Sequence, residues 1–325
     1  MGQSVMTPKQ RAVAALTLQQ PDQVPTFELE FQLEKEVFGR DFFPEALRRE
    51  NVHLLTRLEK ETMLHKLAED VAFVHGELEY CIVPAHHCAA GRFPHESEER
   101  QLFLKYLREM VGDFRMLGDH ADGTFSIPDG NRMYDFVYEI ADDPDGVHAR
   151  AKEIMEIAIE RNKLLAESGI EVGYMCSDYC YNSGPFLSPD MFSQFVTPYL
   201  AKIVEEAKKA GLYVIKHTDG DIMPILDQLV SCKPHALHSL DPMAGVDIKV
   251  VKEMVGDQVA LCGNVNCAYM QTGTDEELVA SAEYCLTHGK PNGGYIYCTS
   301  NVPFTGINPD RYLMLLDVWK RMRDY

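Results

Sequence analysis

Strand-like and helix-like segments alternate through the second half of this chain, and this alternation constrains the fold more than any other feature. Short apolar segments predict strands at Val172–Cys176, Tyr213–Lys216, Ala236–Ser239, Val259–Cys262 and Tyr295–Tyr297. Amphipathic segments around and between them predict helices at 145–168, 188–210, 221–231, 247–255, 274–288 and 309–323. Such alternation is typical of parallel strands joined by right-handed crossovers. We therefore expect an α/β fold.

The first half shows the pattern less clearly. Helices are predicted at 7–18, 44–69 and 98–111, and short strands at Val24–Leu29, Val71–Val74, Cys81–Pro84 and Thr124–Pro128. No Ser/Gly-rich or Pro-rich tract divides the 325 residues, so we expect one domain over 1–325. A single (β/α)8 TIM barrel is favoured over an open doubly wound sheet, and no GxGxxG or GxxxxGK[ST] motif supports nucleotide binding.

The net charge restricts the binding partners of this chain, and its cysteine usage indicates the cellular compartment. The formal net charge of −19 argues against nucleic-acid and anionic-membrane binding, because phosphate binding needs clustered Lys and Arg. No apolar run approaches the roughly 18 residues of a spanning helix. Nine cysteines, an odd number spread along the chain, indicate free thiols in a reducing compartment. A cytoplasmic protein is the expectation.

Polar residues follow the predicted strands of the second half. They are Asp178, His217, Asp219, Asp241, Asn264 and Cys298. A barrel gathers the residues at the carboxyl ends of its strands onto one face, where barrel enzymes have their active sites. We expect these side chains to converge there, with Asp178, Asp241 and Asn264 as catalytic candidates.

The sharpest cluster is His217-x-Asp219 together with Cys298. Imidazole nitrogen, carboxylate and thiolate are zinc ligands, and three protein ligands with one open position describe a catalytic site. The alternative is a hydrogen-bonded histidine in an Asp-Gly turn and an unrelated buried cysteine. Asp178, Asp241 or Glu77 are candidates to donate a proton.

Other residues have two interpretations each. Four aromatic side chains follow predicted strands, where they either wall a substrate pocket or pack: Tyr179, Tyr181, Phe186 and Phe304. Glu28 and Glu30 share one face of the first predicted strand. Either one of them is a carboxylate in the pocket, or both lie at a solvated strand end. The His86–His87 pair is interpreted as loop or surface, because adjacent strand residues point to opposite faces.

Several stretches resemble motifs of the uroporphyrinogen decarboxylase superfamily. They are TPKQRAVAALTLQQPDQVP, SDYCYNSGPFLSPDMFSQFVTPYLAKIVEEAKKAG, VIKHTDGDI, LHSLDPMAGVDIKVVKEMVGDQVALCGNVN and YIYCTSNVPFTGINPDRYLMLLDVW. The resemblance covers the start of the chain and nearly the whole second half, and it implies the barrel fold. Family decarboxylases grip their anionic substrate with an Arg-rich stretch near the N-terminus, where this chain has the acidic TFELEFQLEKEV.

The corrinoid-dependent methyltransferases of the superfamily carry a zinc motif, His-x-Cys with a distant Cys. His217 and Cys298 match two of these ligands, and Asp219 stands in place of the first Cys. The chain resembles O-demethylases most closely, which implies methyl transfer from a small methylated donor, a methoxy-aromatic compound, to the cobalt of a corrinoid protein. A carboxylate ligand would make the zinc harder and suit an oxygen leaving group. The alternatives are that Asp219 is a proton donor or an anchor for His217, or that the chain is a cofactor-free decarboxylase or a non-catalytic barrel that binds a corrinoid protein.

Overall fold

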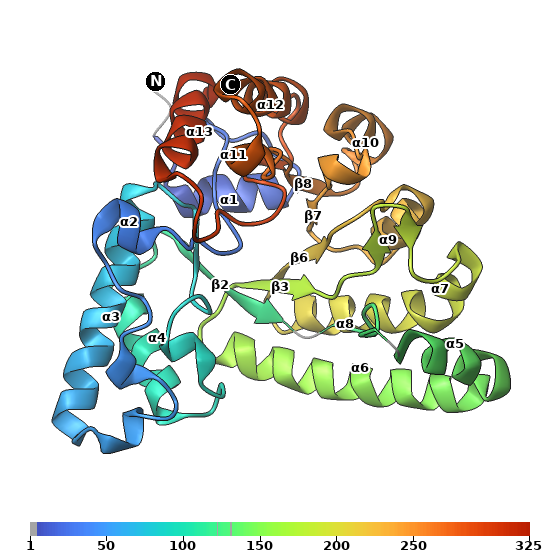
Figure 1. The fold of residues 1–325 in the computed structure, drawn as a ribbon, viewed down its shortest axis with the longest axis horizontal. Coiled ribbons are helices and arrows are strands. Elements are labelled where there is room, and N and C mark those ends of the chain that lie inside the picture. Colours follow the sequence, from blue (N-terminus) through green and yellow to red (C-terminus); the bar gives the residue numbers. More distant parts are fainter. Residues whose placement is uncertain (1–4, 122, 131) are drawn as a thin grey trace.

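A parallel β-sheet forms the centre of the structure, a computed structural model that describes residues 5–121, 123–130 and 132–325 (Figure 1). Within these residues the sheet has seven strands, in the spatial order β1-β2-β3-β6-β7-β8-β9. Their bounds are β1 Ile82–Pro84, β2 Met116–Ala121, β3 Val172–Cys176, β6 Tyr213–Thr218, β7 Ala236–Ser239, β8 Ala260–Gly263 and β9 Tyr295–Ile296. Because all neighbours are parallel, the carboxyl ends of the strands meet at one edge.

Helices surround the strands in Figure 1. They are α1 Pro8–Leu16, α2 Glu34–Phe38, α3 Arg57–Glu77, α4 Glu98–Val111, α5 Arg132–Asp142, α6 Pro144–Glu167, α7 Pro189–Phe195, α8 Thr197–Lys209, α9 Leu226–Ser231, α10 Ile248–Val255, α11 Tyr269–Thr272, α12 Asp275–Gly289 and α13 Pro309–Met322. Capping boxes define the starts of α1, α3 and α12, where a threonine and the Gln or Glu three residues later bond each other's backbone N–H. None of the described helices combines the length and the apolar character needed to cross a bilayer.

Alternate strand residues point to the inside of the curled sheet and pack there. This interior cluster includes Ile82, Met116, Val172, Tyr174, Ile215, Ala260, Cys262, Ile296 and Cys298, and α1 adds Ala12, Ala15 and Leu16. The opposite faces of the strands pack against the helices in a larger cluster. Since side chains fill the inside, a functional site has to lie at an end of the strands.

Residues 25–27 join the two edge strands of the sheet. The Cys81 N–H donates to the Thr26 carbonyl at 2.8 Å, and the Tyr297 N–H donates to the Pro25 carbonyl at 2.9 Å. Thr26 forms an isolated parallel bridge with Tyr297, and the predicted strand Val24–Leu29 is otherwise irregular. The prediction of an eight-stranded barrel is therefore confirmed in part, as a curled parallel sheet of seven strands whose edges this segment connects.

The other predicted elements differ mainly in the first half. Strands predicted at Val172–Cys176 and Ala236–Ser239 are confirmed to the residue. The helix predicted at 188–210 is two helices, α7 and α8, with the break at Val196. Val71–Val74 was predicted as a strand and lies inside α3, 44–56 holds two short 3-10 turns, and Thr124–Pro128 is irregular. The strand β2 was not predicted, because Asp119 and His120 interrupt its apolar pattern.

Candidate active site

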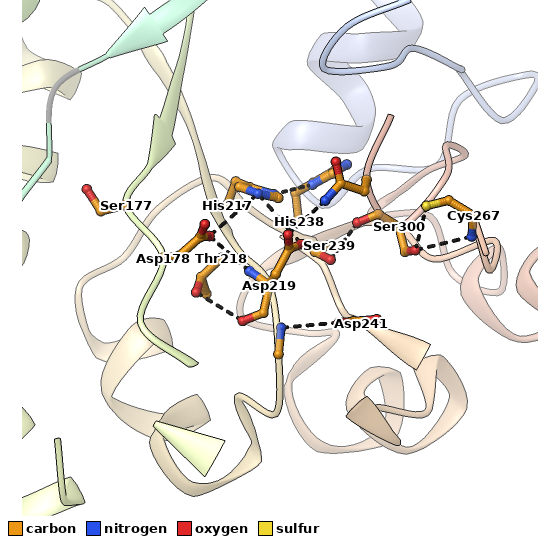
Figure 2. A network of polar contacts seen from close by, with 12 residues as sticks. Ser177, Asp178, His217, Thr218, Asp219, His238, Ser239, Asp241, Cys267 and Ser300 are labelled. Carbon is orange, nitrogen blue, oxygen red and sulfur yellow. Dashed lines mark hydrogen bonds and ion pairs between the residues drawn. The ribbon is translucent and has the colours of Figure 1, made fainter. Parts of the chain in front are cut away.

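Loops after β3 and β6 bring three ionisable side chains together at the carboxyl edge (Figure 2). Asp178 lies two residues beyond β3, His217 lies in β6, and Asp219 follows β6 directly. The His217 Nε2 atom is 3.7 Å from Asp178 Oδ1 and 3.7 Å from Asp219 Oδ1. The three candidate ligand atoms all lie within 4.8 Å of one another.

These separations are too long for hydrogen bonds and close to those of metal ligands. Around a tetrahedral zinc ion with bonds of about 2.0–2.2 Å, two ligand atoms lie roughly 3.3–3.6 Å apart. Asp219 Oδ2 accepts a hydrogen bond from Asn301 Nδ2 at 2.7 Å, whereas the buried Oδ1 accepts none from any described residue. A buried carboxylate oxygen without a donor is costly, so this oxygen is arranged for a cation or a proton.

His217 is held in the form that binds a metal. Burial lowers the pKa of His217 to about 3, and the neighbouring Lys216 adds to the effect, so the ring is neutral at neutral pH. The Nδ1 atoms of His217 and His238 lie 2.8 Å apart and share one hydrogen bond. This bond fixes the ring plane and leaves Nε2 facing the two carboxylates.

The carboxylates of the site repel one another. Burial, together with the charges of Asp178 and Asp241, raises the pKa of Asp219 to about 6. Asp241 is occupied elsewhere, since its Oδ2 accepts from the Gly220 N–H at 3.3 Å and its Oδ1 from the Met243 N–H at 2.9 Å. Asp241 therefore anchors the Asp219–Gly220 turn rather than joining the ligand group.

A buried lysine holds the two loops in place. Lys216 Nζ donates to the carbonyl of Met175 at 3.0 Å, to that of Ser177 at 2.7 Å, and to that of His217. These bonds tie the end of β3 to β6. They fix Asp178 against His217.

Cys298 does not join His217 and Asp219. It lies fully buried in the interior cluster, two residues beyond Ile296 and on the same side of the chain. Burial holds the pKa of the Cys298 thiol well above its usual value, with Glu28 and Cys262 adding to the shift. Of the predicted trio, the structure assembles the first two, and Asp178 completes the group.

Two further predicted residues have structural partners. Asn264 Nδ2 donates to the carbonyls of Leu240 at 2.6 Å and Val246 at 3.2 Å, so it supports the loop after β7. Glu28 is buried and accepts from Thr299 Oγ1 at 2.6 Å. Burial raises the pKa of Glu28 to about 8. Both side chains are engaged in joining chain segments.

The four predicted aromatic residues do not form one wall. Tyr179 is fully buried, and its hydroxyl lies 2.6 Å from Thr124 Oγ1. Tyr181 is exposed in the hairpin of β4 Cys180–Tyr181 and β5 Gly184–Pro185. Phe304 is half-buried against the core, and Phe186 stacks on Phe136 with 6.1 Å between ring centroids.

Phe136 also lines a cavity that was not predicted from the sequence. The cavity measures about 590 Å³ and lies between residues 124–129 and helices α5 and α6, lined by Phe125, Ile127, Phe136, Arg132 and Arg150 among others. Its wall connects to the active-site loop, because the Ile127 N–H donates to the Asp178 carbonyl at 2.9 Å.

Two further predictions need correction. Glu77 is exposed at the end of α3, in the outer helical layer, and does not serve as a proton donor at this edge. His86 and His87 lie in a loop, as predicted, but both are buried and not at the surface. They follow β1 at the same carboxyl edge as the active site.

Comparison with known proteins gives the family. Residues 129–322 match the sequence profile of uroporphyrinogen decarboxylase (URO-D). A solved methyltransferase from Methanosarcina mazei is similar over 97% of this chain and 99% of its own, with a TM-score of 0.72 and 18% identity. An arabinopyranosidase from Geobacillus stearothermophilus is similar over 98% of this chain and 79% of its own, with a TM-score of 0.48 and 10% identity.

No curated protein sequence matches the chain significantly. At 18% identity, the similarity to the solved methyltransferase shows a shared fold only. The profile match spans more than half of the chain and includes β3, β6 and the three clustered side chains. The chain belongs to the uroporphyrinogen decarboxylase family.

Proposed function

We propose that this chain is a metal-assisted methyltransferase, which moves a methyl group from an aromatic methyl ether to the cobalt of a corrinoid on a separate protein. The observation that carries the proposal is the convergence of Asp178, His217 and Asp219, with one buried carboxylate oxygen lacking a donor among the described residues. Family membership and the fold shared with a methyltransferase support it.

Asp178, His217 and Asp219 are the residues that would hold zinc. Two carboxylates and a neutral imidazole balance the charge of the ion. With Nε2 committed as a ligand, His217 carries its proton on Nδ1 and donates it to His238, which serves as the supporting partner of the ligand. When bound, zinc would act as a Lewis acid on the ether oxygen.

The ligand set favours an oxygen leaving group. Oxygen and nitrogen ligands donate less charge than thiolates, so the ion they hold is harder and binds oxygen well. In the transfer, the methyl–oxygen bond breaks and its electron pair stays on oxygen, while the methyl carbon bonds to reduced cobalt through a pair from the cobalt. The released phenolate then takes up a proton from water.

The surroundings suit an aromatic donor better than a polycarboxylate. Phe125 and Phe136 line part of the cavity next to the Asp178 loop, together with charged side chains, and the Arg150 guanidinium lies 5.2 Å from the Phe125 ring centroid and 5.5 Å from that of Phe136. Asp178, Asp219 and Asp241 make the edge acidic. A substrate with many carboxylates, such as uroporphyrinogen, would meet the wrong charge there.

The test compares bound zinc and methyl transfer from a methoxybenzoate to cob(I)alamin in four variants, which are His217→Ala, Asp178→Asn, Asp219→Asn and Cys298→Ser. We expect His217→Ala and Asp219→Asn to lose zinc from this site and to lower methyl transfer by about 100-fold or more, because each removes a ligand. Cys298→Ser is the matched control, since its thiol lies in the interior cluster. It should keep both properties.

Three outcomes would contradict the proposal. Full methyl transfer by both ligand variants would show that the metal group is not used. Loss of zinc and activity in Cys298→Ser, but not in Asp178→Asn, would restore the thiolate ligand set expected from the sequence. Decarboxylation of uroporphyrinogen by the wild type, without methyl transfer, would replace the proposed reaction.

A further inference from the structure

We propose that Glu30, His86 and His120 form a second zinc site at the same edge, separate from the Asp178–His217–Asp219 group. Glu30 follows the segment that joins the edge strands, His86 follows β1 by two residues, and His120 lies in β2. This inference does not depend on the proposed methyl transfer.

The three side chains converge on one carboxylate oxygen. His86 Nε2 lies 3.5 Å and His120 Nε2 3.7 Å from Glu30 Oε1. The three ligand atoms lie within 4.8 Å of one another. As in the first group, these distances exceed hydrogen bonds and approach the roughly 3.3–3.6 Å between ligands of a tetrahedral zinc ion.

Other residues hold the carboxylate in this orientation. Glu30 Oε2 accepts a hydrogen bond from Gln32 Nε2 at 2.9 Å and lies 3.2 Å from His87 Nδ1. These contacts occupy one oxygen and leave Oε1 toward His86 and His120. Metal-ligating carboxylates are usually held by such outer partners.

The side chain of His86 independently indicates that an ion binds here. Its side chain is only 5% exposed, and neither ring nitrogen forms a hydrogen bond with any described residue. A buried imidazole without hydrogen bonds is costly, and a metal ion at Nε2 would remove the part of that cost that arises at this nitrogen. The His120 side chain is 47% exposed, which gives an ion a path into the site and leaves an open coordination position.

The backbone holds both histidines rigidly. A Cβ atom on Gly91 would lie 2.1 Å from the His86 carbonyl oxygen, so the loop after β1 requires glycine there. Buried Arg100 donates to the Gly91 carbonyl at 2.5 Å and pairs with Asp119, the neighbour of His120. One side chain therefore connects the His86 loop to the His120 strand.

Two histidines and one carboxylate with an open position form a known catalytic zinc set. Cys176 lies between the two groups. It pairs in register with His217, and its thiol lies beside His120 without joining either group. The edge would then carry two neighbouring ions, each bound by nitrogen and oxygen.

The experiment titrates metal-free, full-length protein with Zn²⁺ by calorimetry and counts bound zinc after dialysis. Wild type should bind one zinc ion at this site, and two per chain if the Asp178–His217–Asp219 group also binds one. Glu30→Gln and His120→Ala should each weaken zinc binding at this site by about tenfold or more, while His217→Ala removes only the other ion. Co²⁺-loaded protein should show the same pattern in its visible absorption.

His65→Ala is the matched control. His65 Nδ1 lies 3.5 Å from Glu69 Oε1 on the exposed face of α3, the same kind of pair without a third ligand. It should bind zinc like wild type. Unchanged zinc affinity in folded His120→Ala and Glu30→Gln, or an equal loss in His65→Ala, would overturn the site. His120 is half-exposed, so its variant should keep the wild-type circular dichroism spectrum and remain informative if Glu30→Gln unfolds.

Discussion

Burial of histidine has a cost that depends on pH. His75, in α3, is fully buried between Phe42 and Tyr80, and its Nδ1 lies 2.7 Å from the Val71 carbonyl. Burial lowers the pKa of His75 from 6.5 to about 3. Between these values only the unfolded chain takes up the proton, so its contribution to stability is full above about pH 7 and is lost as pH falls.

We therefore expect His75→Gln to reduce acid sensitivity. Glutamine keeps a hydrogen-bond donor and cannot be protonated. Between pH 7 and pH 4, the free energy of unfolding of wild type should fall by on the order of 3 kcal/mol more than that of the variant. Urea denaturation across this range checks it, and parallel pH curves for the two proteins would refute it.

At the residue scale, the sequence predicted part of the site. Strand-end position selected six candidates, and three of them, Asp178, His217 and Asp219, lie close together in the structure. Cys298 was misplaced because side chains two residues apart share a face, and Ile296 already faces the interior. His86 lies in a loop, as predicted, with the Cys88 N–H donating to the His86 carbonyl, but its burial was missed because loop residues are usually at the surface.

At the scale of elements, one ion pair connects α4 to β2. Arg100 and Asp119 have side chains that are each 2% exposed, and they form a direct salt bridge. Charges buried this deeply are costly unless they are paired. The same pair explains why β2 was not predicted, since a strand that carries Asp119 and His120 lacks the apolar run that marks buried strands.

Removing one partner should be more harmful than removing both. Arg100→Met leaves the Asp119 charge buried and unpaired, so we expect a loss of about 3–5 kcal/mol of stability. The double variant Arg100→Met/Asp119→Leu should recover a substantial part of it. Guanidinium denaturation of the two single variants and the double variant measures the coupling, and strictly additive losses would rule it out.

At the scale of the whole molecule, a contact between residues far apart in the sequence joins the two edges of the sheet. Thr26 Oγ1 donates to the Tyr297 carbonyl at 2.9 Å in a buried contact. The second half of the fold was predictable because each unit there is local, a strand followed by its helix. The joining segment was predicted as a strand, but its pairing depends on residues at both edges of the sheet, which local patterns do not reveal.

Loss of the Thr26 hydroxyl should weaken this junction. Thr26→Val keeps the shape and removes the hydrogen bond, so we expect a loss of about 1 kcal/mol in the free energy of unfolding. Thr287→Val is the control, because the Thr287 hydroxyl donates to the Glu283 carbonyl on an exposed helix. Equal effects of the two substitutions in urea denaturation would show that the junction contributes no more to the free energy of unfolding than an exposed hydrogen bond does.

The same junction bears on how the protein is made. Thr26 leaves the ribosome 271 residues before Tyr297. At about 5–20 residues per second, roughly 15 to 50 seconds pass between them. Until the last strand emerges, the strands already made have an open edge, which other nascent chains can pair with. Overproduction should therefore be limited by aggregation during translation, and a lower rate of initiation, which reduces the number of nascent chains, or added chaperones should raise the yield more than any change to the finished protein's surface.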